Sequence, residues 1–259
     1  MRALKKCRLK KLLLSAISVV ALILPLDGFA AYSAIKKDKL LFIKGTGDLF
    51  TDFRIKLTST KIRIIGKMGG AIWREENPNT VSMYNNKDKV FVPVTIDQYA
   101  QEINQGFRPF AIEQIEGPRE ILLDGIKARV YQGFANVPKH GKQNIAEIVC
   151  IDNNWLSPVA HHAWCRILGL NRFDLGLPVS VIQKRDKVIG VKNNVVQYGS
   201  LVRVRVLQCN SIAELPASSE SFSLPVSWKR GRDKGALFFS SDGNLKDRDL
   251  DDLFRTDLK

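Results

Sequence analysis

Histidine and cysteine are scarce in this sequence, and their scarcity limits the chemistry that the protein can perform. The chain of 259 residues contains three histidines and four cysteines. Their one local grouping is His161, His162 and Cys165, in which His161 and Cys165 share a helical face and His162 points about 100° away. Tetrahedral zinc needs three or four ligands, and the remaining histidine, His140, lies in a different segment. We therefore expect no metal site.

Sequence motifs of common enzyme classes are also missing. The chain has no Gly-x-Ser-x-Gly motif of the kind that presents a nucleophilic serine. Gly45-Thr46-Gly47 is not followed by a helical pattern, as a phosphate-binding loop would be. The carboxylates of Glu75 and Glu76 are adjacent in a predicted turn and cannot flank a substrate. We therefore predict a non-enzymatic protein without a cofactor.

Long apolar runs are missing too, since none reaches the roughly 20 residues that span a bilayer comfortably. The apolar run from Leu12 to Leu26 follows six basic residues and precedes Gly28-Phe29-Ala30, a small-x-small pattern that signal peptidase recognises. We predict that residues 1–30 are a signal peptide cleaved before Ala31, and that the protein is exported to the periplasm or cell envelope. Retention of this segment as an N-terminal anchor in the inner membrane is the alternative.

Export would determine the redox environment of the three cysteines that follow the predicted signal peptide, Cys150, Cys165 and Cys209. In an oxidising compartment one disulfide can form, and one thiol is then left over. All three pairings are open, and Cys150–Cys165 closes the shortest loop. Buried free thiols are the alternative.

Acidic residues are outnumbered, because 40 lysines and arginines face 26 aspartates and glutamates, for a net charge of +14. Such an excess favours anionic surfaces in general. The basic faces of the predicted strands carry Arg54, Lys56, Lys61, Arg63, Arg203 and Arg205. Two interpretations stay open: the solubility of a basic exported protein, or docking on an anionic membrane or cell-wall polymer. We expect no nucleic-acid partner.

The segment from Phe50 to Pro93 predicts consecutive antiparallel strands. Apolar residues alternate with polar or charged ones, which indicates a sheet with one packed face and one solvated face. The apolar positions are Phe53, Ile55, Leu57, Ile62, Ile64, Val81, Met83, Val90 and Val92. Turns are predicted at Gly69-Gly70, Asn77-Pro78-Asn79 and Asn85-Asn86.

Two helices are predicted beyond these strands. The first begins at Thr95, which forms a capping-box pattern with Gln98, and ends near Gly106. The second begins at Ser157-Pro158 and ends at Gly169. Their apolar faces comprise Ile96, Tyr99, Ala100 and Ile103 in the first, and Ala160, Ala163, Trp164, Ile167 and Leu168 in the second. Further strands are predicted at 126–134, 144–152, 177–184 and 201–208, with a hairpin turn at Asp124-Gly125.

The order of several short phrases resembles that of the outer-membrane lipoprotein-carrier superfamily. The phrases that match are Lys61-Ile62-Arg63-Ile64, Val81 to Asn85, Lys89-Val90-Phe91, Gly176-Leu177-Pro178-Val179 and Phe222-Ser223-Leu224-Pro225. The resemblance implies an α+β, mainly β fold: a curved antiparallel sheet (half-barrel) with two or more helices packed on its concave side. This half-barrel domain would span residues 31–227, with a charged tail at 228–259.

Members of that superfamily bind acyl chains of lipoproteins or related amphiphiles. The resemblance therefore implies that this protein binds a hydrophobic or amphiphilic ligand, such as an acyl chain, a lipid or a lipoprotein. Candidate residues for the cavity are Ile64, Met83, Tyr99 and Trp164. The alternative is that these side chains fill the core between sheet and helices completely.

Overall fold

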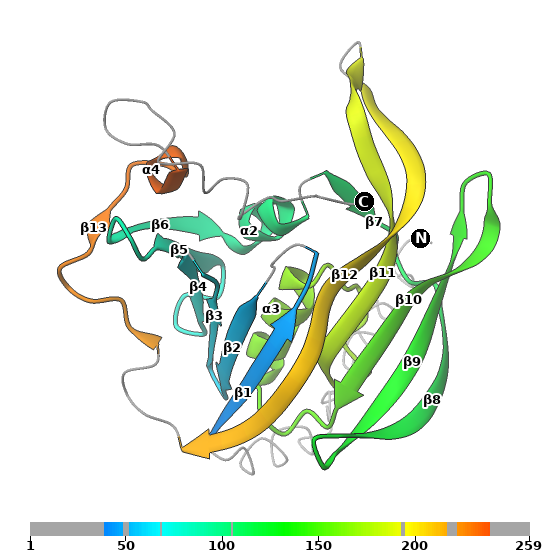
Figure 1. The fold of residues 1–259 in the computed structure, drawn as a ribbon, viewed down its shortest axis with the longest axis horizontal. Helices are drawn as coiled ribbons and strands as arrows, with labels where there is room; N and C mark the ends of the chain where they lie inside the picture. The colour runs from blue at the N-terminus through cyan, green and yellow to red at the C-terminus, as the bar shows by residue number, and fades with distance from the viewer. Residues whose placement is uncertain are drawn as a thin grey trace, which may run out of the picture. The chain divides into compact units, whose positions relative to one another are not determined.

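A computed structural model describes residues 39–48, 52–67, 69–104, 106–192, 195–216 and 222–238. The predicted signal peptide and residues 239–259 of the predicted charged tail lie outside these residues. The strands join in one sheet in the order β13-β6-β5-β4-β3-β2-β1-β12-β11-β10-β9-β8, with β7 paired to β11 (Figure 1). The pairing of β13 with β6 is parallel, and the other described pairings are antiparallel.

The first part of the sheet contains β1 (Lys39–Thr46), β2 (Phe53–Thr58), β3 (Lys61–Ile65), β4 (Gly69–Arg74), β5 (Thr80–Asn85) and β6 (Val90–Thr95). The second part contains β7 (Phe107–Pro109), β8 (Gln114–Leu123), β9 (Ile126–Val137), β10 (Gly141–Ile151), β11 (Leu177–Lys192) and β12 (Val195–Pro216). The strand β13 (Lys229–Arg230) completes it, and the helices are α2 (Ile96–Ile103), α3 (Pro158–Ile167) and α4 (Gly235–Phe238).

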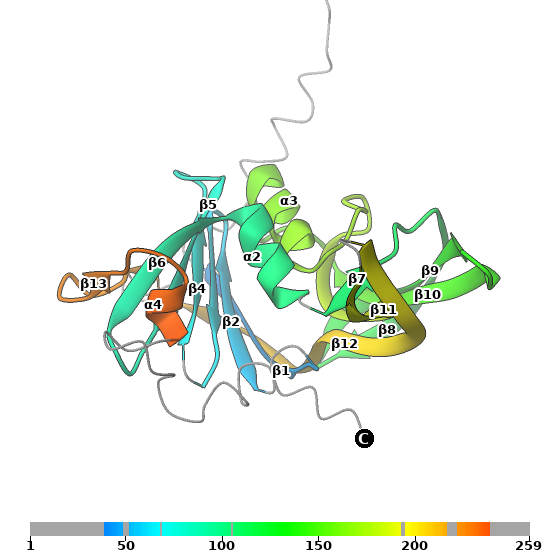
Figure 2. The ribbon, with the colours of Figure 1, turned by 90° about the horizontal axis from the view of Figure 1, so that it is seen from above.

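The sheet is large, curved and unclosed, and α2 and α3 lie against one of its faces (Figure 2). The predicted α+β, mainly β class is therefore confirmed. Within the part of the chain that the structure describes, no helix combines the length and the hydrophobicity needed to cross a bilayer.

The alternation predicted for the first strands is confirmed in β2 and β3, whereas in β5 Tyr84 is buried and Met83 is half-buried. Phe53, Ile55 and Leu57 of β2 are buried, and their neighbours on the strand are half-buried or exposed. The pairing sets Ile55 opposite Ile64 and Lys56 opposite Arg63, so apolar side chains gather on one face and cations on the other.

The turn predicted at Gly69-Gly70 is wrong, because both glycines belong to β4. A Cβ on Gly69 would lie 2.0 Å from the Tyr84 carbonyl oxygen, and one on Gly70 would lie 2.0 Å from the Ile64 carbonyl oxygen. The glycines therefore let neighbouring strands approach closely, which is one reason for glycine within a strand. The turn lies just before them, where the Gly66 N–H donates to the Gly69 carbonyl at 2.7 Å.

Both predicted helix starts are confirmed. Thr95 accepts a hydrogen bond from the Gln98 N–H, and the Gln98 side chain accepts one from the Thr95 N–H, which makes a complete capping box. Ser157 caps α3 by accepting from the Ala160 N–H at 3.0 Å. The Asp124-Gly125 turn is also confirmed, since both residues have positive φ, 49° and 80°.

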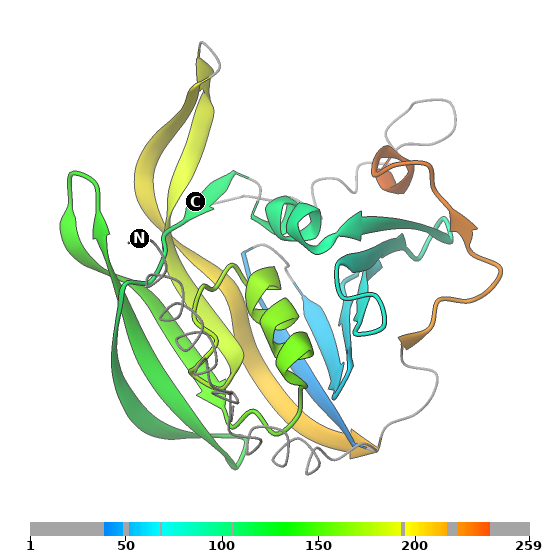
Figure 3. The ribbon, with the colours of Figure 1, turned by 180° about the vertical axis from the view of Figure 1, so that it is seen from behind.

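Residues 222–238 pack along the β6 edge of the sheet (Figure 3). Arg74 donates to the Phe222 carbonyl at 2.7 Å, and Trp228 contacts the Tyr84 ring edge-on at 5.6 Å. Leu237 of α4 is buried in the main hydrophobic core. The basic segment from Lys229 onward thus covers the edge of β6, and Lys234 forms an ion pair with Glu102 of α2.

Candidate functional site

The described part of the interior contains a small apolar void where α2 and α3 meet the sheet. Its volume is about 20 Å³, and it is lined by Phe53, Ile55, Ile64, Ile103, Trp164, Ile167, Leu168, Val206 and Leu207. These residues come from β2, β3, β12, α2 and α3, together with Leu168 at the end of α3. All of the lining side chains are apolar, so the void has room for about one water molecule but offers it no hydrogen-bond partners.

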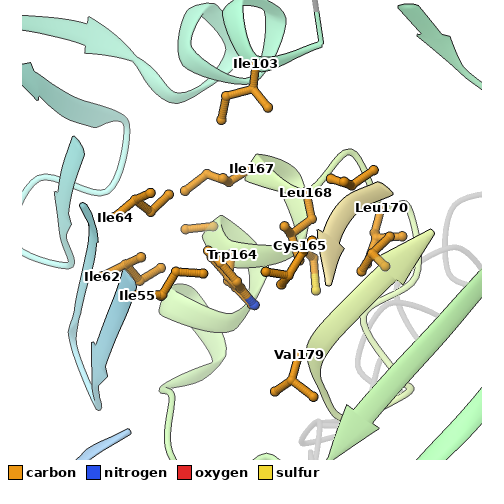
Figure 4. Close-up of a cluster of buried hydrophobic side chains, with 14 of the residues drawn as sticks. Ile55, Ile62, Ile64, Ile103, Trp164, Cys165, Ile167, Leu168, Leu170 and Val179 are labelled. Carbon is orange, nitrogen blue, oxygen red and sulfur yellow. The ribbon is translucent and has the colours of Figure 1, made fainter. Parts of the chain in front are cut away.

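Trp164 is at the centre of this contact (Figure 4). It lies on α3 beside Ile55 of β2 and Ile62 and Ile64 of β3, with Ile103 of α2 beyond Ile167. The indole is 1% exposed, and its Nε1–H donates to the Pro178 carbonyl of β11 at 2.9 Å. The hydrogen bond fixes the orientation of the ring, so Trp164 ties α3 to two parts of the sheet.

The structure brings two of the four predicted cavity residues to the void. Ile64 and Trp164 line it, whereas Met83 and Tyr99 are not among the lining residues. Met83 of β5 is partly buried against the core, and Tyr99 of α2 is 4% exposed, with its pKa raised by burial. The other lining residues followed the same apolar patterns, but the sequence did not indicate which strands each helix would meet.

Arg185 is a second buried feature, and the sequence pattern did not predict it. Its guanidinium, which is fully buried, donates to Gln183 Oε1 at 2.6 and 2.8 Å, to Asn104 Oδ1, and to the Leu168 carbonyl at 3.4 Å. Asn104 and Leu168 are the C-cap residues of α2 and α3. Burial lowers the pKa of Arg185 to about 10.

The position of Arg185 suits a cation because the C-terminal end of a helix carries partial negative charge. Here two such ends meet one guanidinium. Among the described residues, no carboxylate forms an ion pair with it. Arg185 therefore joins the ends of both helices to β11, next to Leu168 at the void.

The histidine and cysteine grouping has the predicted geometry, with His161 and Cys165 buried in the core and His162 exposed. The His161 Nε2–H donates to the Gly176 carbonyl at 2.8 Å, and Cys165 Sγ lies 3.6 Å from the same nitrogen. His162 points elsewhere and stacks on Phe173 at 4.2 Å. In the described residues, no group of three or more potential ligands could hold a metal ion.

The cysteines of the predicted disulfide, Cys150 and Cys165, are free and fully buried. Burial raises the pKa of each thiol to about 12, so both are protonated at neutral pH. Cys209 is also a free thiol, with its pKa raised by burial to about 11. In the structure Cys150 and Cys165 are thus buried free thiols, and Cys209 is a half-buried one.

The predicted basic residues fall into two groups separated by β1. Arg54 and Lys56 of β2 lie beside Lys61 and Arg63 of β3. Arg63 also donates to the Tyr84 hydroxyl at 3.2 Å, which fixes it against the sheet. In the second group, Arg205 forms an ion pair with Asp48 at 2.7 Å, and Arg203 is exposed.

A wider hollow of about 270 Å³ lies at an irregularity in β10, between Asn144 and Ala146. Polar side chains make up much of its lining, with Gln132 donating to Glu147 at 3.2 Å and Asn144 donating to Gln132 at 2.7 Å. Lys184 and Arg203 also line it from paired positions on β11 and β12. Its lining mixes polar and charged side chains with Ile145, Ala146 and Ile182, whereas that of the interior void is apolar throughout.

Comparisons with known proteins add little to this geometry. No family model and no curated protein matches the chain. Among solved structures, the chain is similar to an uncharacterized conserved protein from Thermus thermophilus, with 7% sequence identity and a TM-score of 0.36. The match covers 79% of this chain and 98% of that one. Similarity at this level carries no argument about function.

Proposed function

We propose that the protein is a non-enzymatic binder of hydrophobic or amphiphilic ligands, which holds an acyl chain of a lipid or lipoprotein inside a half-barrel. In this proposal the curved sheet is the half-barrel, and α2 and α3 pack on its concave side. The observation that carries the proposal is the all-apolar void at the junction of both helices with β2, β3 and β12. The pattern of residues 1–30 supports export of such a protein to the cell envelope.

The void must widen before it can hold a chain, since about 20 Å³ is far smaller than the 150 Å³ or so of an apolar cavity that binds benzene. The movement needed is a shift of α3 away from the sheet, which breaks the hydrogen bonds of Trp164 to Pro178 and of His161 to Gly176. Each bond lost costs on the order of 1 kcal/mol. Burying a CH₂ group contributes about 0.8 kcal/mol, so a few methylenes offset the loss.

The test compares two substitutions on one strand face. Val206 lines the void, whereas Val204, two residues away and also buried, does not. Val206→Ile should fill the void, keep or raise the free energy of unfolding by up to about 1 kcal/mol, and reduce uptake of a fluorescent fatty acid several-fold. Val204→Ile adds the same methylene where there is no void, so it should cost about 1–3 kcal/mol.

Probe uptake by the folded fraction of Val204→Ile should match that of the wild type. Equal uptake by all three proteins would show that the probe does not use the void. Failure of the wild type to bind any amphiphile would mean that the void is a packing defect in a complete core.

A second candidate function is docking of the basic β2–β3 face on an anionic membrane or wall polymer. The paired positions of Lys56 and Arg63, beside Arg54 and Lys61, favour it. Binding of this kind should weaken steeply as ionic strength rises, whereas burial of an acyl chain should not. Pull-down with anionic polymer at low and high salt distinguishes the two functions.

A further inference from the structure

Strands β11 and β12 continue past the rest of the sheet as a two-stranded ribbon, which we call the arm (residues 187–192 and 195–200). β10 pairs with β11 only as far as Gln183, β7 reaches Lys187, and β1 pairs with β12 only as far as Gln208. Beyond these points the two strands pair with each other, as at Val188 and Tyr198. The arm projects from the sheet in both opposite views (Figures 1 and 3).

The arm exposes apolar side chains on both of its faces. Ile189 is 63% exposed, Val196 41% and Tyr198 40%. A Cβ on Gly199 would lie 2.7 Å from Ile189 Cγ2, so Ile189 covers the face to which position 199 points. Successive residues of a strand point to opposite faces, which places Tyr198 on the other one. Both faces of the arm therefore present exposed apolar side chains.

This exposure is unusual within the molecule. Of the seven large apolar residues that are exposed in the described part of the chain, three lie on the arm. A two-stranded ribbon is marginally stable in water, and its free edges and apolar side chains favour aggregation. An exposed apolar ribbon of this kind is explained most simply if a membrane or another molecule covers it.

The charge of the arm indicates what covers it. From Lys187 to Ser200 the chain contains no acidic residue, but it contains Lys187 and Lys192. Arg108 of β7 adds a cation at the base of the arm, where its guanidinium lies 5.0 Å from the centre of the Tyr198 ring. Apolar residues and tyrosine next to cations suit the interface of an anionic bilayer, where the rings and aliphatic groups enter the headgroup layer and the cations meet phosphates.

We propose that the arm docks the protein on anionic lipid bilayers, with Ile189, Val196 and Tyr198 in the headgroup region and Lys187 and Arg108 at the phosphates. A bilayer covers both faces of the arm at once. A strand added to one edge would leave both faces exposed, and a second arm from another copy would bring like charges together. The proposal goes beyond ligand binding in the interior and does not depend on it.

The first experiment measures flotation of the protein with vesicles of phosphatidylcholine mixed with phosphatidylglycerol, and with vesicles of phosphatidylcholine alone. The wild type should bind the anionic vesicles more tightly. The double substitution Ile189→Ser with Tyr198→Ser should weaken that binding about tenfold or more. The matched control is Leu122→Ser with Val226→Ser, which removes two apolar side chains exposed elsewhere (72% and 104%) and should bind as the wild type does.

The second experiment changes charge. Lys187→Glu should weaken binding to anionic vesicles about tenfold, since each cation near such a surface contributes about 1 kcal/mol. The matched control is Lys127→Glu on β9, another exposed lysine, which should have little effect. Uptake of the fluorescent fatty acid should be the same in the arm variants and the wild type, so a failure of docking is distinguishable from a failure of the interior site.

Three results would overturn the proposal. One is a wild type that does not bind anionic vesicles, and another is equal binding by the arm and control variants. The third is a wild-type dimer by light scattering that the arm substitutions make monomeric without any effect on vesicles, because the arm would then join two copies of the chain.

Discussion

His161 is buried on α3 next to Cys165, and its imidazole is tied to a backbone carbonyl. It is 5% exposed, and its Nε2–H donates to Gly176 at 2.8 Å. Burial lowers the pKa of His161, chiefly because the charged form loses hydration in the core. The residue that invited a metal-binding interpretation in the sequence is therefore held as a neutral group within the packed structure.

This neutral histidine predicts how stability depends on pH. In the unfolded chain His161 takes up a proton as the pH falls through about 6.5, whereas the folded protein resists protonation there. The unfolded state then binds more protons, so the free energy of unfolding should decrease as the pH falls from 7 towards 5. His161→Gln keeps a donor near Gly176 and cannot titrate, so its stability should fall less. Urea unfolding at several pH values measures the difference, and equal slopes for both proteins would contradict the prediction.

The helices α2 and α3 are held in one way at their N-terminal ends and in another at their C-terminal ends. Local capping fixes each start, at Thr95 and Ser157. Each end depends on Arg185 of β11, which is distant in sequence from α2. The packing of α2 and α3 as a pair thus depends on one side chain of the sheet.

Arg185→Ala should therefore destabilise the protein substantially. The substitution removes a large buried side chain and leaves the oxygens of Gln183 and Asn104 without donors, at a cost of about 3 kcal/mol in the free energy of unfolding. Lys187→Ala, on the exposed part of the same strand, should change it by at most about 0.5 kcal/mol. Denaturant unfolding of both variants provides the measurement. An Arg185→Ala variant as stable as the Lys187→Ala variant would show that the helices do not depend on the guanidinium.

At the scale of the whole molecule, the features predicted correctly from sequence are those that neighbouring residues determine. Thr95 with Gln98, Ser157 with Pro158, and Asp124-Gly125 each specify a cap or turn through their own backbone chemistry. The glycines of β4 misled the prediction because their role is close approach to Tyr84 and Ile64, residues of other strands. The lengths of β11 and β12 were also underestimated, since their ends lack the strict alternation of a strand packed on one face.

In the candidate site, too, features set by neighbouring residues were predictable, and features set by residues distant in sequence were not. The apolar faces of the strands and helices were readable, and Ile64, Tyr99 and Trp164 are buried as those faces predict. Arg185 was missed although it continues the buried series Val179, Val181 and Gln183 at every second position. A cation in that series conflicts with the rule that buried positions are apolar, and only the two helix ends that meet there explain it.

Native mass spectrometry after mild extraction shows whether the interior of the protein holds an acyl chain. We expect a population heavier than the bare chain by the mass of a lipid or fatty acid. That population should decrease in Val206→Ile and persist in the folded fraction of Val204→Ile. A wild type that appears only at its bare mass, and stays there after incubation with fatty acids and phospholipids, would contradict the account.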